Sequence, residues 1–366
     1  ASALAYTSYR MLNAVGAGQH LKDHVQPIED ILVVDGRPYD GLKRGGPGPD
    51  QLHFDRREIS PEDDGEALGY MAENRWTRVA LAKAAEEAGL TVFAPARASH
   101  MEPDVTPGRN RLVLESGETL EAPLIVGCDG KFSGLRAQAG VRTTDYAYNQ
   151  KAVVLTVEHE HSHEGVAYEC FMPTGPFAIL PLPGNRSSLV WCERPKAADA
   201  LKDMDDAGFQ EALEARFGDF LGWVKPVSPR WTYPLTLKFA ERFTDDRLAL
   251  VGDAAHVIHP LAGQGINLGL LDAAVLAEEL GRARAAGLPV THATILARYE
   301  RRRRADNLLM QNAMRGFKLL FERPEPAVRW LRNTGLGLVN RLAPARHAFM
   351  HRALGRAGDL PRNARP

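Results

Sequence analysis

Two short apolar runs in this chain are each followed by a glycine and, within two residues of it, an acidic residue. Residues 124–126 and 248–251 have the length and composition of strands that are covered on both faces. Asp129 follows the first run and Asp253 follows the second, and apolar residues recur at helical spacing after position 265. Acidic residues at the carboxyl ends of such strands lie at the usual ligand-binding edge of an open α/β sheet. The pattern therefore predicts two strand–turn–helix units of the nucleotide-binding type.

Between these two units the period changes from helical spacing to alternation. Four alternating runs are separated by turns rich in proline and glycine, at residues 153–157, 166–171, 177–182 and 188–192. These runs predict an antiparallel sheet. Residues 111–121 predict a hairpin, residues 209–217 an amphipathic helix and residues 231–237 a returning strand.

Composition is that of an ordinary globular protein. The length of 366 residues corresponds to two or three domains at about 150 residues each. Three cysteines, Cys128, Cys170 and Cys192, cannot all pair and lack metal-ligand spacing, which favours a reducing cytoplasm. We assign Cys128, inside the Asp129 turn, to packing. No apolar run approaches the roughly 20 residues of a transmembrane helix, and no signal peptide is visible, so we expect a cytoplasmic protein that does not span the membrane.

Charge is unevenly distributed along the chain. From residue 301 to the end, fifteen Lys and Arg stand against four Asp and Glu, so this tail carries about +11 and the rest of the chain about −12. Its apolar residues predict amphipathic helices. We favour a helical bracket that packs on the protein with a solvated arginine face; the alternative is peripheral contact with the inner face of an anionic membrane. The arginine run at 301–304 is too short to indicate nucleic-acid binding.

The segment around the second acidic turn leaves backbone amides open to a ligand. Residues 262–265 carry too little side chain to shield their own amides, and the helix behind them favours negative charge at its N-terminus. Asp129 can accept hydrogen bonds from sugar hydroxyls, and Arg136 can reach a phosphate or pair with that carboxylate. Each glycine–aspartate turn alone is also a common structural turn, but the two together favour a nucleotide site.

The histidines do not indicate a metal, and we predict no metal site. His256 and His259 lie three residues apart but in a loop and without carboxylate partners. His159, His161 and His163 alternate among acidic neighbours, so we expect them to be solvated.

The two acidic segments carry a family resemblance. Asp-Gly-x-x-Ser-x-x-Arg at 129–136 and Gly-Asp-Ala-Ala-His…Pro-Leu-Ala-Gly-Gln-Gly-x-Asn-Leu-Gly at 252–269 resemble the second and third FAD fingerprints of flavoprotein aromatic hydroxylases. Within that superfamily the chain most resembles the ubiquinone-biosynthesis hydroxylases. Three regions carry this finer likeness: the opening residues 2–8, the helix start at 73–74 and the tail residues 299–310. The resemblance extends over essentially the whole chain.

The resemblance implies an α/β fold that combines a Rossmann-like FAD-binding domain, an antiparallel-sheet substrate domain and a helical C-terminal tail. We expect the FAD-binding domain at residues 1–24, 73–144 and 244–300, the substrate domain at 25–72 and 145–243, and the basic helical region at 301–366. The implied activity is hydroxylation of an aromatic ring, on a polyprenyl phenol of ubiquinone biosynthesis, with FAD, NAD(P)H and O2 through a flavin C4a-hydroperoxide.

The resemblance also implies roles for single residues. It assigns Asp253 to the ribityl chain, and Asp129 and Arg136 to the ribose and pyrophosphate region. The remaining implied cofactor contacts are Arg78, Gly130, Gly252, Gly263, Gln264, Gly265 and Asn267. The amides of Gly263, Gln264 and Gly265 face the N1–C2 edge of the flavin, and Pro260 shapes the wall beside its oxygen-reactive face. The residues with an implied catalytic role are therefore Pro260, Gly263, Gln264 and Gly265.

One departure from the family pattern is large. No Gly-x-Gly-x-x-Gly turn is present in this sequence, and Gly45-Gly46-Pro47-Gly48 predicts a loop because charged residues precede it and a proline interrupts it. We therefore expect a sequence truncated by roughly one βαβ unit of ~30 residues or more. Two alternatives remain open: a degenerate homologue that acts as a non-catalytic assembly partner of quinone-pathway enzymes through its basic tail, and a related flavin reductase. A halogenase would need a dedicated lysine, which we do not identify.

Overall fold

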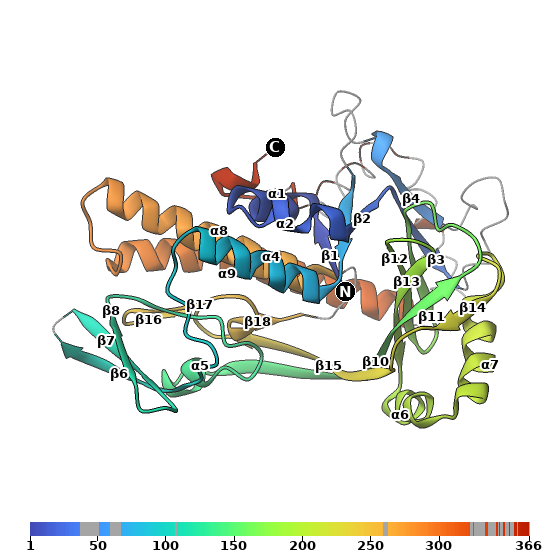
Figure 1. The fold of residues 1–366 in the computed structure, drawn as a ribbon, viewed down its shortest axis with the longest axis horizontal. Coiled ribbons are helices and arrows are strands. Elements are labelled where there is room, and N and C mark those ends of the chain that lie inside the picture. The colour runs from blue at the N-terminus through green and yellow to red at the C-terminus, as the bar shows by residue number, and fades with distance from the viewer. Residues whose placement is uncertain are drawn as a thin grey trace.

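A large mixed sheet at one end of the molecule is joined to a long helical layer and smaller sheets at the other (Figure 1). The computed structural model describes residues 1–36, 51–58, 67–106, 108–258 and 263–322, residue 325 and short stretches between 334 and 365. Strands β10 (Thr143–His159) and β15 (Trp231–Ala240) run from the large sheet toward the opposite end. These two strands therefore connect the two halves of the molecule.

The large sheet has nine strands in the order β18-β15-β10-β13-β12-β11-β3-β4, with β14 also paired with β10. The four predicted alternating runs lie in β10, β11, β12 and β13, which pair antiparallel as predicted. Strand β3 is parallel to β11 and antiparallel to β4. The bounds of the other strands are β11 Val166–Met172, β12 Gly175–Leu182, β13 Arg186–Glu193, β3 Asp30–Asp35, β4 Gln51–Asp55, β14 Val224–Pro226 and β18 His256–Val257.

The two faces of this sheet pack against different elements. Helices α6 (Pro195–Asp203) and α7 (Asp206–Phe217) cover what we call the outer face, where Phe209 and Phe217 of α7 are buried as predicted. The opposite, inner face packs against residues of β1 (Ser2–Ala5), α1 (Tyr6–Ala14) and β5 (Gly69–Ala72). The inner face therefore looks toward the half of the chain that carries the acidic turns.

Three smaller sheets complete the strands of the described part. Strands β1, β5 and β2 (Val25–Ile28) form one, and β6 (Ala98–Thr106), β7 (Arg109–Leu114) and β8 (Thr119–Ala122) form another. The predicted hairpin is confirmed as β7 and β8. In the third sheet, β17 (Leu248–Leu250) lies between β16 (Thr244–Asp245) and β9 (Ile125–Gly127), and β9 is parallel to β17. These two parallel strands are the apolar runs identified in the sequence.

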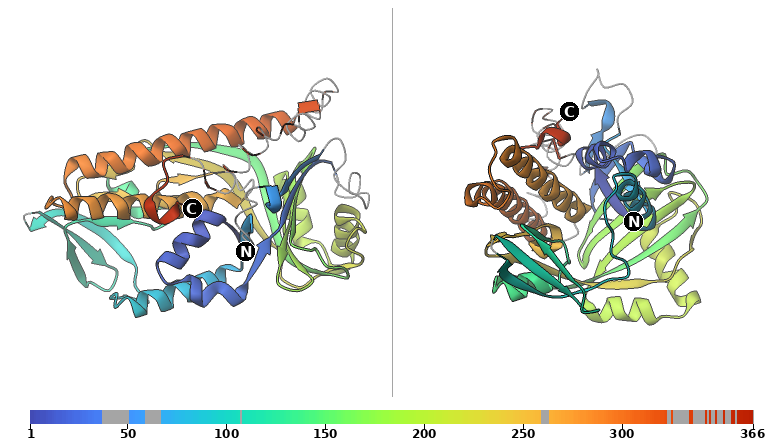
Figure 2. Two further views of the ribbon diagram at one scale, coloured as in Figure 1. Left: turned by 90° about the horizontal axis from the view of Figure 1, so that it is seen from above. Right: turned by 60° about the vertical axis from the view of Figure 1, so that its left-hand side comes forward.

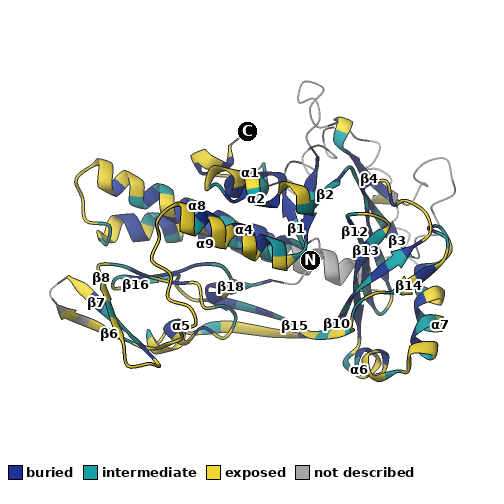
Figure 3. Cartoon of the chain, in the orientation of Figure 1, coloured by how far each residue is buried: buried dark blue, intermediate teal, exposed yellow. Residues whose placement is uncertain are grey.

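Two long helices, α8 (Gln264–Ala285) and α9 (Ala293–Glu322), lie side by side over this half (Figure 2). Helices α2 (Gly18–Leu21) and α4 (Asn74–Glu87) pack against each other beside them. The predicted domain boundary between residues 300 and 301 falls inside α9; the division into domains stays a prediction. Exposed residues line the outer surfaces of these helices, as Figure 3 shows. Within the described part, no helix combines the length and apolar character needed to cross a bilayer.

Two predictions about individual side chains are wrong. His159 and His163 are buried rather than solvated: His159 is held by the carbonyl of His161 and the hydroxyl of Ser187, and the Nε2 of His163 bonds the carbonyl of Leu182. Cys128 is exposed rather than packed. The burial of a side chain depends on which distant segments pack against it, and the polarity of its neighbours in the sequence does not predict this.

Candidate active site

The two acidic turns lie next to each other at one edge of a parallel strand pair. Leu250 of β17 is in register with Gly127 of β9, and the amide of Val251 donates to the carbonyl of Gly127 at 3.0 Å. Adjacent strands are about 4.8 Å apart. Asp129 and Asp253, which follow these positions by two and three residues, therefore leave the same edge side by side.

Arg136 joins the two turns directly. Its side chain is buried, with 7% of the residue exposed, and lies on the short helix α5 (Gly134–Gln138). One guanidinium nitrogen donates to the carbonyl of Ala254 at 2.7 Å and the other to the carbonyl of Lys131 at 3.0 Å. The guanidinium thus holds the two loops in a fixed relation. Because both bonds are made to backbone carbonyls, contact of Arg136 with a phosphate stays a prediction.

Asp129 shapes its own turn. Its carboxylate accepts hydrogen bonds from the Ser133 hydroxyl at 2.5 Å and from the amide of Leu135 at 3.2 Å. The Ser133 oxygen in turn caps α5 by accepting from the amide of Arg136 at 3.0 Å. Asp129 is exposed, and Gly130 has a φ of +81° with no atom within 4 Å of an added Cβ. The turn is therefore preformed and open on its outer side, as a hydroxyl-binding carboxylate requires.

Asp253 is the carboxylate with free bonding capacity at this edge. It lies in a 3-10 turn at Gly252–Ala254, and no described residue donates a hydrogen bond to it. The residue is exposed, yet the surrounding protein displaces enough water to raise its pKa, against the attraction of His256 and Lys131. Gly252 adopts a φ of +62° and lies beside Gly269 of α8, where a Cβ would be 3.7 Å from the Gly269 Cα. Glycine at both positions therefore allows the strand turn to approach the helix closely.

Helix α8 begins directly after a glycine turn. Gly263 precedes the helix with a φ of +61°, and a Cβ at this position would lie 3.0 Å from the Cβ of Ala3 in β1. Helix α8 has no acidic residue in its first turn. A Cβ at Gly265 would meet no atom within 4 Å. Gln264, by contrast, is buried. The first amides of α8 are therefore oriented beside a space that suits a partly negative group.

Asn267 holds this turn in place. Its amide oxygen accepts from the backbone amide of Ala5 at 2.8 Å, and its amide nitrogen donates to the carbonyls of Ala3 at 3.0 Å and Gly263 at 3.2 Å. Asn267 is 3% exposed. The side chain thus ties strand β1 to the start of α8, and a direct cofactor contact for Asn267 stays a prediction.

A buried charged cluster behind the turn was not predicted from the sequence. Asp272 of α8, fully buried, accepts hydrogen bonds from the amide of Gly252 at 3.0 Å, from Nε2 of His256 at 2.6 Å and from Nε of Arg303 at 2.7 Å. Burial alone would raise the pKa of Asp272, but the charges and hydrogen bonds of His256 and Arg303 outweigh it and lower the pKa to about 2. Asn307 adds a further donor at 3.4 Å. The cluster locks the Asp253 turn to both long helices.

The other predicted site residues are placed separately. Arg78 lies exposed on α4, where no described residue forms an ion pair or hydrogen bond with it. Pro260 and His259 lie outside the described residues. His256 belongs to the buried cluster and not to a metal pair. The described part contains no group of three or more His, Cys, Asp or Glu that could hold a metal ion.

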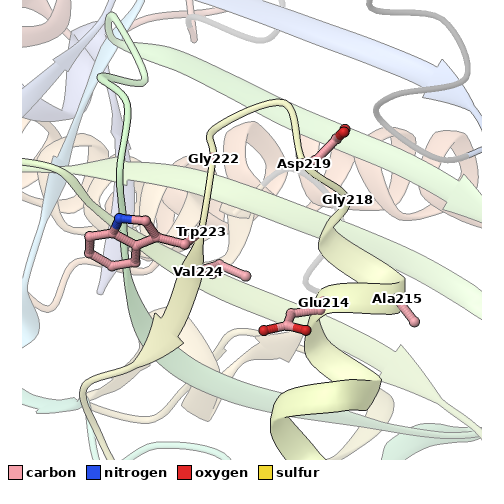
Figure 4. Close-up of a pocket in the computed structure, with 7 residues that line it drawn as sticks. All are labelled: Glu214, Ala215, Gly218, Asp219, Gly222, Trp223 and Val224. Atoms are coloured by element: carbon pink, nitrogen blue, oxygen red, sulfur yellow. The ribbon is translucent and has the colours of Figure 1, made fainter.

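A pocket of about 620 Å³ lies elsewhere, at the end of α7 and in the loop leading to β14 (Figure 4). Its lining includes Glu214, Asp219 and Trp223, and none of the predicted site residues. The lining comes from a single helix end and the loop after it, on the outer side of the large sheet. It is therefore separate from the acidic turns.

The residues of the site suit an FAD nucleotide. The donor set combines an exposed carboxylate with free acceptor capacity at Asp253, a second carboxylate at Asp129 and the uncapped amides after Gly263. Carboxylates bind sugar hydroxyls, and helix amides bind phosphate or the electron-rich edge of a flavin. The glycines at 130 and 265 leave room where a Cβ would otherwise project. The site thus meets the requirements of a long, partly anionic dinucleotide.

Comparison with known proteins defines the class. A family model described as an FAD binding domain matches residues 1–312, and the chain belongs to this family of FAD-binding flavoproteins. It is an FAD-dependent monooxygenase of the aromatic hydroxylase type, which uses NAD(P)H as co-substrate and acts with O2.

Individual relatives make the placement finer. The chain is 45% identical over 355 residues to a ubiquinone hydroxylase, UbiL, of Rhodospirillum rubrum. The aligned region covers 97% of this chain and 79% of the relative. It is 37% identical over 291 residues to the 3-demethoxyubiquinol 3-hydroxylase of Escherichia coli, covering 79% and 73%. Among solved structures, the p-nitrophenol 4-monooxygenase PnpA of Pseudomonas putida matches with a TM-score of 0.77 at 19% identity, over 97% of this chain and 88% of that one. This last likeness is one of fold, and it confirms the predicted α/β architecture.

Proposed function

We propose that this FAD-dependent hydroxylase acts on a prenylated phenol of ubiquinone biosynthesis. The observation that carries the flavoenzyme function is the pair of acidic turns at one strand edge, clipped together by Arg136 beside an open helix N-terminus. The substrate class is supported by the relatives, of which one is a ubiquinone hydroxylase and another a 3-demethoxyubiquinol 3-hydroxylase.

Each group of the site has a distinct task in this proposal. When bound, FAD supplies the electron transfer from NAD(P)H and the activation of O2. Asp253 and Asp129 accept hydrogen bonds from the hydroxyls of the cofactor and orient it. The amides after Gly263 stabilise negative charge at the flavin edge, because the positive end of the α8 dipole lies at this turn. Asn267 and the Asp272 cluster keep these groups in position without contacting the reacting atoms.

The first test concerns cofactor binding. The purified chain should carry visible flavin absorbance, and Asp253→Asn should reduce the FAD content because the amide nitrogen replaces an acceptor with a donor. Asp246→Asn is the matched control, since Asp246 lies in the turn before β17, is highly exposed and, among the described residues, forms its ion pair with its neighbour Arg247. A colourless wild-type chain that takes up no FAD would instead favour the assembly-partner alternative.

The second test concerns the reaction. With FAD bound, a prenylated phenol should stimulate NAD(P)H consumption, and mass spectrometry should find a product heavier by one oxygen atom. A yellow protein that consumes NAD(P)H equally with and without the phenol, and forms no hydroxylated product, would support the reductase alternative and contradict the proposal.

We further propose that the basic tail contacts an anionic membrane surface, where a polyprenyl substrate resides. Support comes from α9, on which Leu308 and Leu309 are 38% and 53% exposed and Arg301 is exposed about two turns before them. The protein should sediment with vesicles that contain anionic lipid and not with neutral vesicles. Arg301→Glu should weaken this binding. Arg97→Glu is the control and should not weaken it, because Arg97 is an exposed arginine outside the basic tail. Equal sedimentation with both vesicle types would refute this contact.

A further inference from the structure

Strand β11 carries one acidic residue on an otherwise apolar surface. Tyr168 and Cys170 belong to the cluster that packs against α6 and α7, whereas Ala167 belongs to the cluster on the inner face. Because side chains alternate along a strand, Glu169 points to the inner face, on the same side as Ala167. Its direct neighbours across the sheet are Val33 of β3 and Ala178 of β12. Glu169 is thus a lone carboxyl group flanked by aliphatic side chains.

The inner face leads to the start of α8. Ile31, Val33 and Leu180 on this face pack in one cluster with Tyr6 and with Ala3 of β1. Ala3 is also the residue that lies against Gly263, where a Cβ would come within 3.0 Å of the Ala3 Cβ. The inner-face cluster and the start of α8 therefore meet at Ala3.

No described residue forms a hydrogen bond or an ion pair with Glu169, although the residue keeps some exposure. The titratable residue nearest along the same face of β3 is Asp35, two positions from Val33. Helix α9 also contacts β11 and has Arg315, Lys318 and Glu322 in its last turns. Burial raises the pKa of Glu169 to about 8, and among the described residues no charge contributes to this shift. Near neutral pH the carboxyl group is therefore protonated and carries both a donor and an acceptor.

We propose that Glu169 is a substrate-binding residue that hydrogen-bonds a ring hydroxyl of the aromatic substrate on the inner face of the nine-stranded sheet. This inference rests on the proposed function, because it assumes that a phenol is bound beside the flavin. A neutral carboxyl group complements a phenol, which also offers one donor and one acceptor, and the surrounding aliphatic side chains suit the ring. The group sets which ring position faces the flavin and does not itself transfer oxygen.

The pH dependence follows from the chemistry of this group. Below pH 8 the carboxyl group is neutral, and the ring can cover it at little cost. As the pH rises through about 8 the group ionises, and covering a charge with an apolar ring is unfavourable. Substrate binding should therefore weaken above pH 8, while a phenol with an ordinary pKa near ~10 is still neutral.

The experiment measures phenol binding to the oxidised FAD-bound protein, by perturbation of flavin absorbance, and steady-state KM and kcat across pH 8. Glu169→Leu should raise Kd and KM about 3- to 10-fold with a smaller effect on kcat, the scale of one lost neutral hydrogen bond. Glu169→Gln, which keeps a donor and an acceptor, should bind within about 2-fold of wild type and lose the pH dependence. Glu158→Gln is the control, since Glu158 lies on β10 in an exposed pair with Lys225.

The outcomes separate this inference from the proposed function. If wild type hydroxylates the phenol but Glu169→Leu has an unchanged Kd, or Glu169→Gln keeps the pH dependence, the role of Glu169 is refuted and the proposed function stands. If wild type binds the phenol with the expected pH dependence but forms no hydroxylated product, the proposed function fails and the assigned role of Glu169 in binding is upheld. A wild-type protein with bound FAD and no measurable affinity for any phenol overturns both.

Discussion

Replacing Asp272 by asparagine should destabilise the whole half of the molecule that carries the acidic turns. The variant keeps the size of the side chain and removes its charge. Arg303, 1% exposed, then stays buried with only the partly exposed Asp306 as a countercharge, and the amide of Gly252 loses a charged acceptor. Removing one partner of a buried ion pair is costly because the remaining charge is left without compensation.

The magnitude can be approached in two ways. Breaking a buried pair by deleting one member typically costs about 3–5 kcal/mol. Independently, the pKa of Asp272 lies at about 2 against an ordinary 3.8, and at about 1.4 kcal/mol per pKa unit this lowering corresponds to about 2 kcal/mol. We therefore expect the free energy of unfolding to fall by about 2–5 kcal/mol at neutral pH.

The sign of the pH dependence is fixed by the direction of this shift. Because the pKa is lower in the folded protein, the stability that Asp272 contributes is fully present above pH 3.8 and is lost as the pH falls through about 2. Wild type should lose stability across this interval more steeply than Asp272→Asn.

Urea unfolding of the FAD-bound protein, followed by tryptophan fluorescence, measures the effect. Glu241→Gln breaks an exposed pair with Arg142 and should cost less than about 1 kcal/mol. Adding Arg303→Met to Asp272→Asn should restore part of the loss, because the unpaired cation is removed. The reasoning is refuted if Asp272→Asn is no more destabilising than the exposed control, or if the double variant is simply the sum of the two single ones.

Two further predictions concern cofactor binding. Gly263→Val places a branched side chain at a φ of +61° against Ala3, which should cost about 1–2 kcal/mol and raise the FAD dissociation constant roughly 5- to 30-fold in a fluorescence titration. Gly281→Ala, inside α8 with no atom within 4 Å of its Cβ, should leave that constant unchanged. Arg136→Lys should accelerate FAD release in stopped-flow measurements, because a single ammonium group cannot span both carbonyls that the guanidinium joins. An unchanged release rate would show that the link to Ala254 does not organise the site.

Local chemistry was sufficient to predict the elements of this site. The runs that became β9 and β17 are short, apolar and closed by glycine, and both form strands as predicted. Only β17 is buried on both faces, because Val126 in the middle of β9 is exposed. Alternation predicted the strands from β10 to β13 for the same reason, since period and turn residues are properties of neighbouring positions. The glycine turn before α8 likewise depends on backbone freedom within a few residues.

Tertiary contacts decided what several of these side chains do. Arg136 donates to the carbonyl of Ala254, which lies 118 positions later, and not to Asp129, which was one of the two partners that the sequence left open. His256 and Arg303 meet at Asp272 across separations of 16 and 31 residues. The arginine run therefore turns inward at Arg303, and Arg302 next to it pairs with Glu278 and Glu279 of α8, where sequence alone favoured a solvated face.

The amino-acid sequence by itself determined which segments form strands, turns and helices here, and it placed two carboxylates at strand ends, because those properties depend on residues close together in the chain. Only the packing of α8 and α9 on the β17 turn decided which charges are buried together, and only the strand register decided that Glu169 looks toward the cofactor half. Pairing partners and faces depend on segments far apart in sequence, whose approach is set by the burial of the common core.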